Sequence, residues 1–471
     1  MNIKRALALL LLATPAFAQS VTLNPFPQPI AATEGVIPVN FVEFATIPDI
    51  GGTAARLMLM VDEPGTRRLF VNDMRGPLYS VSYDGKSVQT YVDVNAPAWG
   101  VNVQSQGRER GFQSFAFHPQ FSQPGTLGFG KFYTFTDTAN MEPNPDFRPA
   151  GAEGNTHDTV LLEWTAKTPA GATYDGGAPR ELMRFEQPFA NHNAGHITFN
   201  TTAAPGAADY GLLYMGVADG GSGGDPLDLA QSKASGFGKI LRIDPLGKSS
   251  ANGKYGIPAN NPFVKEQGTL GEIYAIGVRN PQRFAWDPSN GRLFMSDIGQ
   301  NTVEEISEVT AGADLGWNTW EASYKFVSRE GVDMSNPRSD PNVTYPIAEW
   351  DQLDPILLQN NSSMATIGVV YRHEAIPALR GRILFGDGPS GEIFHVSADS
   401  LPQGGQDAIH RVLFRQNGQT KTLLQLIQEK ATAQGREPVL RADLRFGPAN
   451  DGRIFVLNKA DSVVRMIVPW R

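Results

Sequence analysis

Two loops of this chain carry residues whose types suit proton transfer and ligand binding. The first reads Asn191-His192-Asn193-Ala194-Gly195-His196 and runs into an apolar, strand-like stretch. A histidine flanked by amides in a glycine-containing loop suits a general base, because imidazole titrates near neutral pH. We therefore expect His192 to be a base and His196 to be structural. A zinc pair is disfavoured, because Gly195 and the following strand argue against the helix that this spacing needs.

The second loop is Arg279-Asn280-Pro281-Gln282, where one apolar strand gives way to the next. A hairpin follows it, with a Pro-Ser-Asn-Gly turn between short apolar strands at 284–287 and 292–296. Such a hairpin does not need a cation and two amides at its entrance. We therefore expect Arg279 and Asn280 to contact a ligand. The alternative for Arg279 is a salt bridge at the strand end.

Two polar glycine-containing loops are candidate cation sites. The run Asp219–Asp225 reads DGGSGGD and offers carboxylates and backbone carbonyls, which are donors that calcium prefers. A flexible turn explains this run equally well, and it lacks the GxGxxG context of a dinucleotide site. Gly299-Gln300-Asn301 is a similar loop, with Glu304 and Glu305 close behind.

A repeated strand pattern must position these loops. A turn, a short apolar strand, another turn and a second strand recur about six times along the chain. The first strands of these copies are Arg68–Val71, Lys131–Thr134, Leu212–Met215, Arg292–Met295, Arg382–Phe385 and Arg453–Val456. One copy cannot bury both faces of its sheet, whereas copies stacked radially can, which predicts an all-β chain folded as a six-bladed β-propeller. Two stacked β-sandwiches are the alternative, and Thr420–Gln434 is the one convincing helical period.

Composition sets the remaining bounds. With 471 residues and 41% hydrophobic content the chain can bury a large core, and no linker divides it into two domains. The net charge of −8 argues against nucleic acid or an anionic membrane as partner, and the absence of cysteine excludes disulfides and thiolate metal sites. A basic start, a short apolar run and Ala16-Phe17-Ala18 predict a signal peptide at 1–18, cleaved after Ala18. We expect an extended arm at 19–40, a body at 41–471 without a membrane span, and a periplasmic or secreted location.

In this order, the motifs resemble the soluble sugar dehydrogenases that depend on pyrroloquinoline quinone (PQQ), the glucose/sorbosone dehydrogenase family. The match runs roughly from Phe41 to Ile467. Its motifs are Glu109-Arg110-Gly111, Phe115–Pro119, Asn191–Gly195, Gly238–Ile243, Arg279–Gln282, Gly299 with Glu304-Glu305-Ile306, Gly316-Trp317 and Ala449–Gly452. The resemblance implies a six-bladed propeller that binds PQQ and calcium and oxidises the anomeric hydroxyl of an aldose to the lactone. It also implies a sugar substrate and an electron acceptor as partners, with a monomer or homodimer as the assembly.

The resemblance implies roles for individual residues. His192 matches the base that takes the proton of the anomeric hydroxyl as hydride passes to the quinone. Glu109 and Asn191 match positions beside the cofactor and this base, and Arg279 and Asn280 match residues that touch the quinone oxygens.

Calcium binding and the cofactor's carboxylates involve four further positions. The carbonyls of Gly299 and Gln300 match peptide oxygens that bind the calcium, although the family commonly has proline at the second position. PQQ is a tricarboxylate, so its pocket needs several cations. Arg372 stands where the family has a lysine, and Arg441 stands alone where the family has two closely spaced arginines.

Further departures leave two other functions open. Asn458-Lys459 replaces an acid that the family has after the final strand. A changed cofactor pocket favours a non-enzymatic extracellular binding propeller of the same fold. The other alternative is a calcium-dependent, lactonase-type hydrolase.

Overall fold

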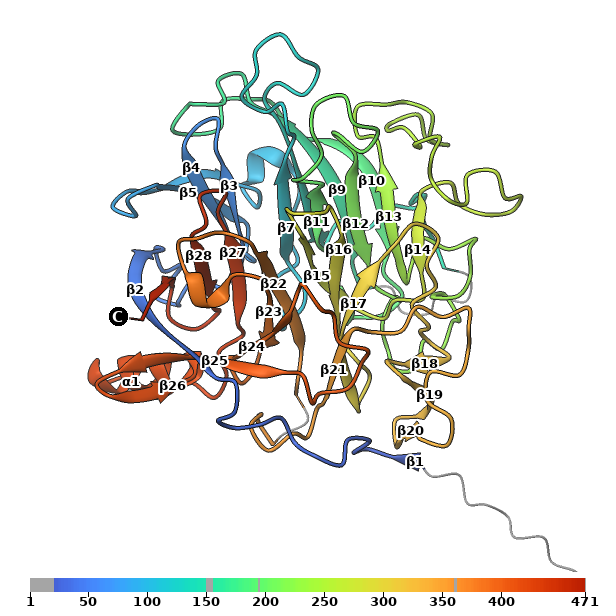
Figure 1. The fold of residues 1–471 in the computed structure, drawn as a ribbon. Coiled ribbons are helices and arrows are strands. Elements are labelled where there is room, and N and C mark those ends of the chain that lie inside the picture. The colour runs from blue at the N-terminus through green and yellow to red at the C-terminus, as the bar shows by residue number, and fades with distance from the viewer. Residues whose placement is uncertain (1–20, 150–155, 194, 360–361, 471) are drawn as a thin grey trace, which may run out of the picture.

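The computed structural model describes residues 21–149, 156–193, 195–359 and 362–470, so the predicted signal peptide lies outside the described residues. Within them the chain forms five four-stranded antiparallel sheets and one nine-stranded sheet, with a single α-helix and two short 3-10 helices. In Figure 1 the sheets follow one another in chain order, from blue through green and yellow to red. The predicted all-β class is confirmed.

Four sheets consist of strands that are consecutive or nearly so along the chain. They are β3 (Leu57–Glu63), β4 (Arg68–Asp73), β5 (Pro77–Ser82) and β6 (Val88–Asp93); β7 (Phe112–Phe117), β8 (Lys131–Thr138), β9 (Asp158–Thr165) and β10 (Arg180–Glu186); β11 (Ile197–Phe199), β12 (Leu213–Val217), β13 (Lys239–Ile243) and β14 (Ile273–Ile276); and β15 (Pro281–Trp286), β16 (Leu293–Asp297), β17 (Val303–Val309) and β21 (Ala348–Asp351). The apolar strands that recur in the sequence are second strands of these groups, namely β4, β8, β12 and β16.

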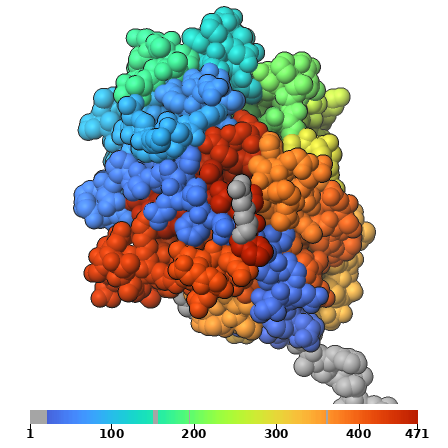
Figure 2. All heavy atoms as spheres, turned by 60° about the vertical axis from the view of Figure 1, so that its left-hand side comes forward, coloured from blue at the N-terminus to red at the C-terminus, as the bar shows by residue number. Residues whose placement is uncertain are grey.

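The nine-stranded sheet joins the two ends of the chain. It contains β22 (Ala365–Tyr371), β23 (Arg382–Asp387), β24 (Glu392–Ser397), β25 (His410–Gln416), β26 (Gln419–Lys421), β27 (Arg445–Pro448), β28 (Ile454–Leu457), β29 (Val463–Pro469) and β2 (Ile37–Thr46). Strand β2 pairs antiparallel with β29 and parallel with β25, which places Val39 opposite Pro469. Figure 2 shows the blue N-terminal segment against the orange and red C-terminal part. The N-terminal strand therefore completes a sheet made by the last strands of the chain.

A small sheet lies beside these groups. It contains β1 (Val21–Thr22), β18 (Trp320–Glu321), β19 (Tyr324–Ser328) and β20 (Gly331–Asp333), and three of its strands are inserted between β17 and β21. The segment after β1 lies along the body, because Ile30 N–H donates to Asp354 Oδ2 at 2.7 Å and Arg411 Nη1 donates to Ala32 O at 2.9 Å. Strand β2 begins inside the range that the sequence predicts as an extended arm.

The predicted helix is present as α1 (Leu423–Ala433). Thr422 caps its N-terminus in a capping box with Gln425, and Leu423, Leu424 and Ile427 are buried, as their helical spacing predicts. Strand β26 occupies the first residues of the predicted range. No helix in the described part of the chain is long and apolar enough to cross a membrane.

The sheets contact one another in a closed order. Strand β3 contacts β27 and β7, β7 contacts β11, β12 contacts β15, and β22 contacts both β15 and β27. Apolar clusters fill the space between neighbouring sheets, as where Phe70 of β4 packs against Phe117 of β7 with ring centroids 4.6 Å apart. Loops that enter the first strands therefore converge at one end of the molecule.

A buried carboxylate holds the loop before β7. Asp137 of β8 accepts hydrogen bonds from Gly111 N–H at 2.9 Å, Gln113 Nε2 at 2.7 Å and Thr159 Oγ1 at 2.5 Å. Burial raises the pKa of Asp137 to about 7, although these hydrogen bonds favour the charged form. This group therefore binds a proton more tightly in the folded chain than in the unfolded chain.

The raised pKa of Asp137 makes its contribution to stability depend on pH. Between its unfolded pKa of 3.8 and the folded value of about 7, the unfolded chain has released the proton that the folded chain retains, so stability falls as pH rises. Asp137→Asn removes this pH-dependent contribution to stability. We therefore expect the difference in free energy of unfolding, variant minus wild type, to rise by up to about 1 kcal/mol per pH unit from pH ~4 to pH ~7. Urea unfolding across this range measures it, and parallel pH profiles would contradict the prediction.

Candidate functional site

A cavity of about 360 Å³ opens where loops lead into the first strands of the sheets. The segments before β7, β11, β15, β22 and β27 contribute to its wall, together with the loop after β16. Eight of the nine residues proposed from the sequence line it: Glu109, Asn191, His192, Arg279, Asn280, Gly299, Gln300 and Arg441. Residues far apart in the chain are thus brought to one site.

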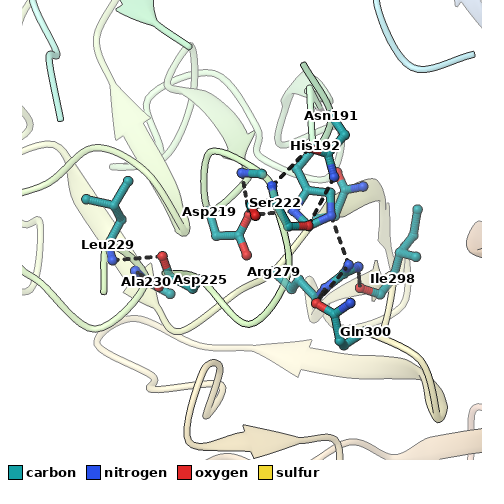
Figure 3. A network of polar contacts seen from close by, with 12 residues as sticks. Asn191, His192, Asp219, Ser222, Asp225, Leu229, Ala230, Arg279, Ile298 and Gln300 are labelled. Carbon is teal, nitrogen blue, oxygen red and sulfur yellow. Dashed lines mark hydrogen bonds and ion pairs between the residues drawn. The ribbon is translucent and has the colours of Figure 1, made fainter. Parts of the chain in front are cut away.

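The imidazole of His192 is held from both sides. Its Nδ1 lies 2.6 Å from Asp219 Oδ1, and its Nε2 lies 2.8 Å from Arg279 Nη2 (Figure 3). A guanidinium can only donate, so Nε2 must accept, and the ring proton therefore sits on Nδ1 and is donated to Asp219. The backbone N–H of His192 donates to Glu109 Oε2 at 2.7 Å. The φ angle of His192 is 56°, which lies in the left-handed region. The site thus fixes one tautomer and leaves the Nε2 lone pair directed at Arg279.

Asp219 is a buried carboxylate with partners on both oxygens. Besides His192, it accepts from Gly221 N–H at 2.9 Å and from Trp317 Nε1 at 2.9 Å. Burial alone would raise the pKa of Asp219, but the interaction with His192, the charge of Arg279 and the hydrogen bond from Gly221 outweigh it, so the pKa lies below its ordinary value. Asp219 is therefore ionised at neutral pH. The sequence pointed to it only as a possible calcium ligand.

The guanidinium of Arg279 is fixed by neutral acceptors. Its Nη1 donates to Ile298 O at 2.8 Å, its Nη2 lies 3.3 Å from Gln300 Oε1, and its Cζ lies 5.6 Å from the centre of the Trp317 ring. Within the described residues it forms no salt bridge with a carboxylate, so the strand-end salt bridge considered as an alternative is not present. The positive charge remains available to the cavity.

The loops around Asn280 and Gln300 are tied together by a buried acid and an amide. Backbone N–H groups of Arg279 and Asn280 donate to the two oxygens of Asp297, at 2.8 and 2.6 Å. Burial raises the pKa of Asp297 to about 7, although these N–H groups oppose the shift. Gln300 Oε1 accepts from Gly224 N–H at 2.9 Å, which joins the loop after β16 to the glycine-rich loop.

No cluster of three or more histidine, aspartate and glutamate side chains suited to a metal occurs among the described residues. In the glycine-rich loop, Asp225 accepts the N–H groups of Leu229 and Ala230 at 3.0 and 2.8 Å. Gly299 has no room for a side chain, because a β-carbon there would overlap the Val303 carbonyl. Calcium binding by the backbone carbonyls of Gly299 and Gln300 therefore stays a prediction.

The structure places Arg372 away from these residues. It follows the far end of β22, where its Nη2 lies 2.6 Å from Asp287 Oδ2 and its Nη1 pairs with Asp399. Only the segment before β22 reaches the site cavity, and seven strand residues span about 20 Å. Arg372 instead lines a second cavity of about 410 Å³. The expectation that Arg372 lies with the cofactor-binding residues is corrected accordingly.

The site cavity is also lined by cations that were not predicted from the sequence to bind a cofactor. Arg445, the first residue of β27, is 2% exposed, and its Nε has no hydrogen-bond partner among the described residues. Burial lowers the pKa of Arg445 to about 10, so it stays charged at neutral pH. Arg441 pairs with Asp443 at 2.5 Å, and Lys459 Nζ donates to Arg108 O at 2.9 Å. The four-residue spacing of Arg441 and Arg445 could have indicated a pair, because even spacing along extended chain keeps side chains on one face.

The cavity is strongly cationic in an acidic protein. Its carboxylates are Glu109 and Asp443, and its basic side chains are Arg108, Arg279, Arg329, Arg441, Arg445 and Lys459. Burial lowers the pKa of Lys459 well below its ordinary value. Near the chain end, Arg445 and Lys459 line the cavity besides Arg441, so the basic side chains there are not limited to the one singled out from the sequence. Such a wall favours a ligand with several negative charges.

Comparison with curated proteins finds relatives in plants, bacteria and animals. The HIPL1 protein of Arabidopsis thaliana is 28% identical over 374 residues, which cover 71% of this chain and 51% of that protein. The aldose sugar dehydrogenase YliI of Escherichia coli is 29% identical over 136 residues, 28% of this chain and 31% of that protein. The human Hedgehog-interacting protein is 25% identical over 229 residues, 47% of this chain and 29% of that protein. The chain spans about half the length of the plant relative.

Solved structures share the fold. The soluble aldose sugar dehydrogenase of Escherichia coli, in its apo-form, superposes with a TM-score of 0.62 at 17% identity, covering 91% of this chain and 99% of that one. The PQQ-bound aldose sugar dehydrogenase of Streptomyces coelicolor gives a TM-score of 0.56 at 19% identity, covering 91% and 96%. The family model described as Glucose / Sorbosone dehydrogenase matches residues 58–412. With that match across most of its length, this chain belongs to the glucose/sorbosone dehydrogenase family.

Proposed function

We propose that this protein is an exported PQQ- and calcium-dependent dehydrogenase that oxidises the anomeric hydroxyl of an aldose to the lactone. Its body would be a single six-bladed propeller. The observation that carries the proposal is the imidazole of His192, held in one tautomer between Asp219 and Arg279 beside a cavity rich in cations.

The residues of the cavity fit a planar tricarboxylate cofactor. Arg279, Arg441, Arg445 and Lys459 supply basic side chains from two walls. The buried Nε of Arg445 lacks a partner, and a carboxylate oxygen would satisfy this donor. When bound, PQQ would accept a hydride from C1 of the sugar, and calcium held by the carbonyls of Gly299 and Gln300 would polarise it.

His192 would move the proton. The Nε2 lone pair, which accepts an N–H of Arg279 in this structure, would accept the proton of the anomeric hydroxyl as the C1–H bond breaks. Loss of that proton and of a hydride converts the hydroxyl carbon to the carbonyl of the lactone. The ionised Asp219 would stabilise the resulting imidazolium through Nδ1–H, and Arg279 would stabilise negative charge on the reduced cofactor.

Glu109 and Asn191 support the position of this base. Glu109 accepts the His192 N–H, and Asn191 exchanges two hydrogen bonds with the backbone of Ser222, at 3.2 and 2.9 Å. These contacts fix the loop on both sides of a histidine in a backbone conformation that such residues seldom adopt. We therefore assign Glu109 and Asn191 positioning roles.

A non-enzymatic binding propeller is the second candidate. Similarity to the Hedgehog-interacting protein, whose name describes a binding function, favours it. A lactonase-type hydrolase has less support. Its chemistry needs side-chain carboxylates that converge on a metal, and the described residues hold no such cluster.

Cofactor binding tests the proposal directly. Titration of the apoprotein with PQQ, with and without calcium and followed by absorbance, should show saturable, calcium-dependent binding. Addition of an aldose should then reduce the bound quinone. We expect Arg445→Gln to weaken PQQ binding about 10- to 100-fold, the scale of one charge-assisted hydrogen bond. Arg372→Gln is the matched control and should leave the affinity unchanged. Absence of saturable binding would leave the binding propeller as the better explanation.

The assignment of the base predicts a separation of binding from turnover. His192→Ala should keep PQQ binding and lower the rate of quinone reduction by about two to four decades, the usual scale for loss of a general base. Asp219→Asn should also lower this rate. Both carboxylate oxygens of Asp219 now accept hydrogen bonds, whereas an amide has only one accepting oxygen. Stopped-flow absorbance of a single turnover measures both rates. A near wild-type rate for His192→Ala would remove that residue from the chemistry.

A further inference from the structure

Two arginines at the mouth of the cavity are unpaired, and we propose that they bind the anionic group of an acidic aldose. The substrate class is then an aldose that is anionic at carbon 6, either a hexuronic acid, whose C6 is the carboxylate carbon, or a sugar 6-phosphate. This inference rests on the proposed function and names its substrate. Arg329 and Arg108 are the residues that would determine this specificity.

Arg329 reaches the cavity from the turn between β19 and β20. It is exposed, and its guanidinium forms no hydrogen bond or ion pair within the described residues, although it lines the same cavity as His192. The guanidinium lies against Gly223 so closely that a β-carbon on this glycine would overlap it. The glycine at this point of the glycine-rich loop therefore admits Arg329, which gives that loop a role besides a flexible turn.

Arg108 reaches the cavity from the loop before β7. It is exposed, and its side chain likewise has no hydrogen bond or ion pair in the described part of the chain. Its neighbour Glu109 accepts the backbone N–H of His192. On the other side, Gly223 follows Ser222, which is hydrogen-bonded to Asn191 beside His192 (Figure 3). Arg108 therefore lies in a loop bonded directly to the loop of His192, and Arg329 packs against a second loop that is bonded to it.

The other cations of the cavity already have partners or lie deeper. Arg279 contacts His192 and Ile298, Arg441 pairs with Asp443, and Arg445 is buried at the start of β27. The cofactor's carboxylates can be met by these groups and Lys459. This leaves Arg108 and Arg329 without an assigned anion.

A neutral sugar offers these two guanidinium groups no charge. Covering an unpaired cation with a neutral ligand costs free energy, because the cation loses water without gaining a counter-charge. A carboxylate or phosphate accepts two parallel N–H bonds from one guanidinium. In a pyranose, C1 and the carbon that bears C6 both bond to the ring oxygen. An anomeric hydroxyl at His192 thus keeps the C6 anion within reach of side chains that flank it.

The decisive experiment measures preference between matched sugars. With the PQQ- and calcium-loaded protein, kcat/KM is determined for glucose, glucuronate and glucose 6-phosphate, whose comparison separates a carboxylate from a phosphate preference. We expect an acidic aldose to be preferred over glucose. The ratio of acidic to neutral kcat/KM should fall about 10- to 100-fold in Arg329→Gln and in Arg108→Gln, as for loss of one charged hydrogen-bonding partner.

Two further variants separate this specificity from a general structural effect. Gly223→Ala keeps the charge of Arg329 but displaces its guanidinium, so it should lower the same ratio. Arg436→Gln changes an exposed arginine outside the cavity and should not change it. Glucose preferred over both acidic sugars, or a ratio unaffected by Arg329→Gln, would overturn the proposal.

A binding measurement keeps this inference distinct from the dehydrogenase proposal. Calorimetric titration of the protein without PQQ should show glucuronate binding that weakens in Arg329→Gln and at high ionic strength. If glucuronate binds in this way but no aldose reduces the quinone, the dehydrogenase proposal fails and the anion site stands. If only neutral aldoses reduce the quinone, the dehydrogenase proposal stands and the anion site fails.

Discussion

The contact on which this site depends is the buried hydrogen bond between Asp219 and His192. An ionised carboxylate is tolerated in a protein interior only where charged or hydrogen-bonding groups compensate it. Here the compensation comes from His192, Arg279 and Trp317, which belong to three different loops. Moving any one of these loops would remove a partner from a buried charge, so the carboxylate favours one arrangement of the loops.

The same arrangement decides the chemistry of the histidine. Because Arg279 can only donate, it keeps the Nε2 lone pair free of a proton, while Asp219 holds the proton on Nδ1. The Arg279 guanidinium donates to this lone pair and so occupies it until a substrate hydroxyl takes that place. We infer that the site is set for proton acceptance only when a ligand fills the cavity.

The charge of the cavity contrasts with that of the whole chain. Six basic side chains and two carboxylates line it, whereas the protein carries a net charge of −8. Two of these cations, Arg279 and Arg445, are buried, and burial lowers the pKa of Arg445. A ligand with several negative charges would offset the cost of burying these positive charges. The positive field at one end of the molecule therefore argues for an anionic ligand more strongly than any single arginine.

The sequence alone determined the local features. Short apolar strands between turns predicted the β class, the apolar stripe of Thr420–Gln434 predicted α1, and residue types in their loops singled out His192 and Arg279. These features could be predicted because they depend on residues that are close together in the sequence. Only the tertiary structure showed that β2 pairs with β29 and that Asp219 faces His192, because long-range pairing leaves no local pattern.

Two arginines show most clearly what the sequence could not predict. Arg372 and Arg445 both lie next to strands of the nine-stranded sheet, and from the sequence either could face a cofactor. Arg372 follows the end of β22 and Arg445 begins β27, so strand direction places the first at the opposite end and the second in the cavity. Strand direction relative to a site is a property of how sheets assemble. Residue type could therefore predict which chemistry was available, but only the packing of the sheets decided which charges meet.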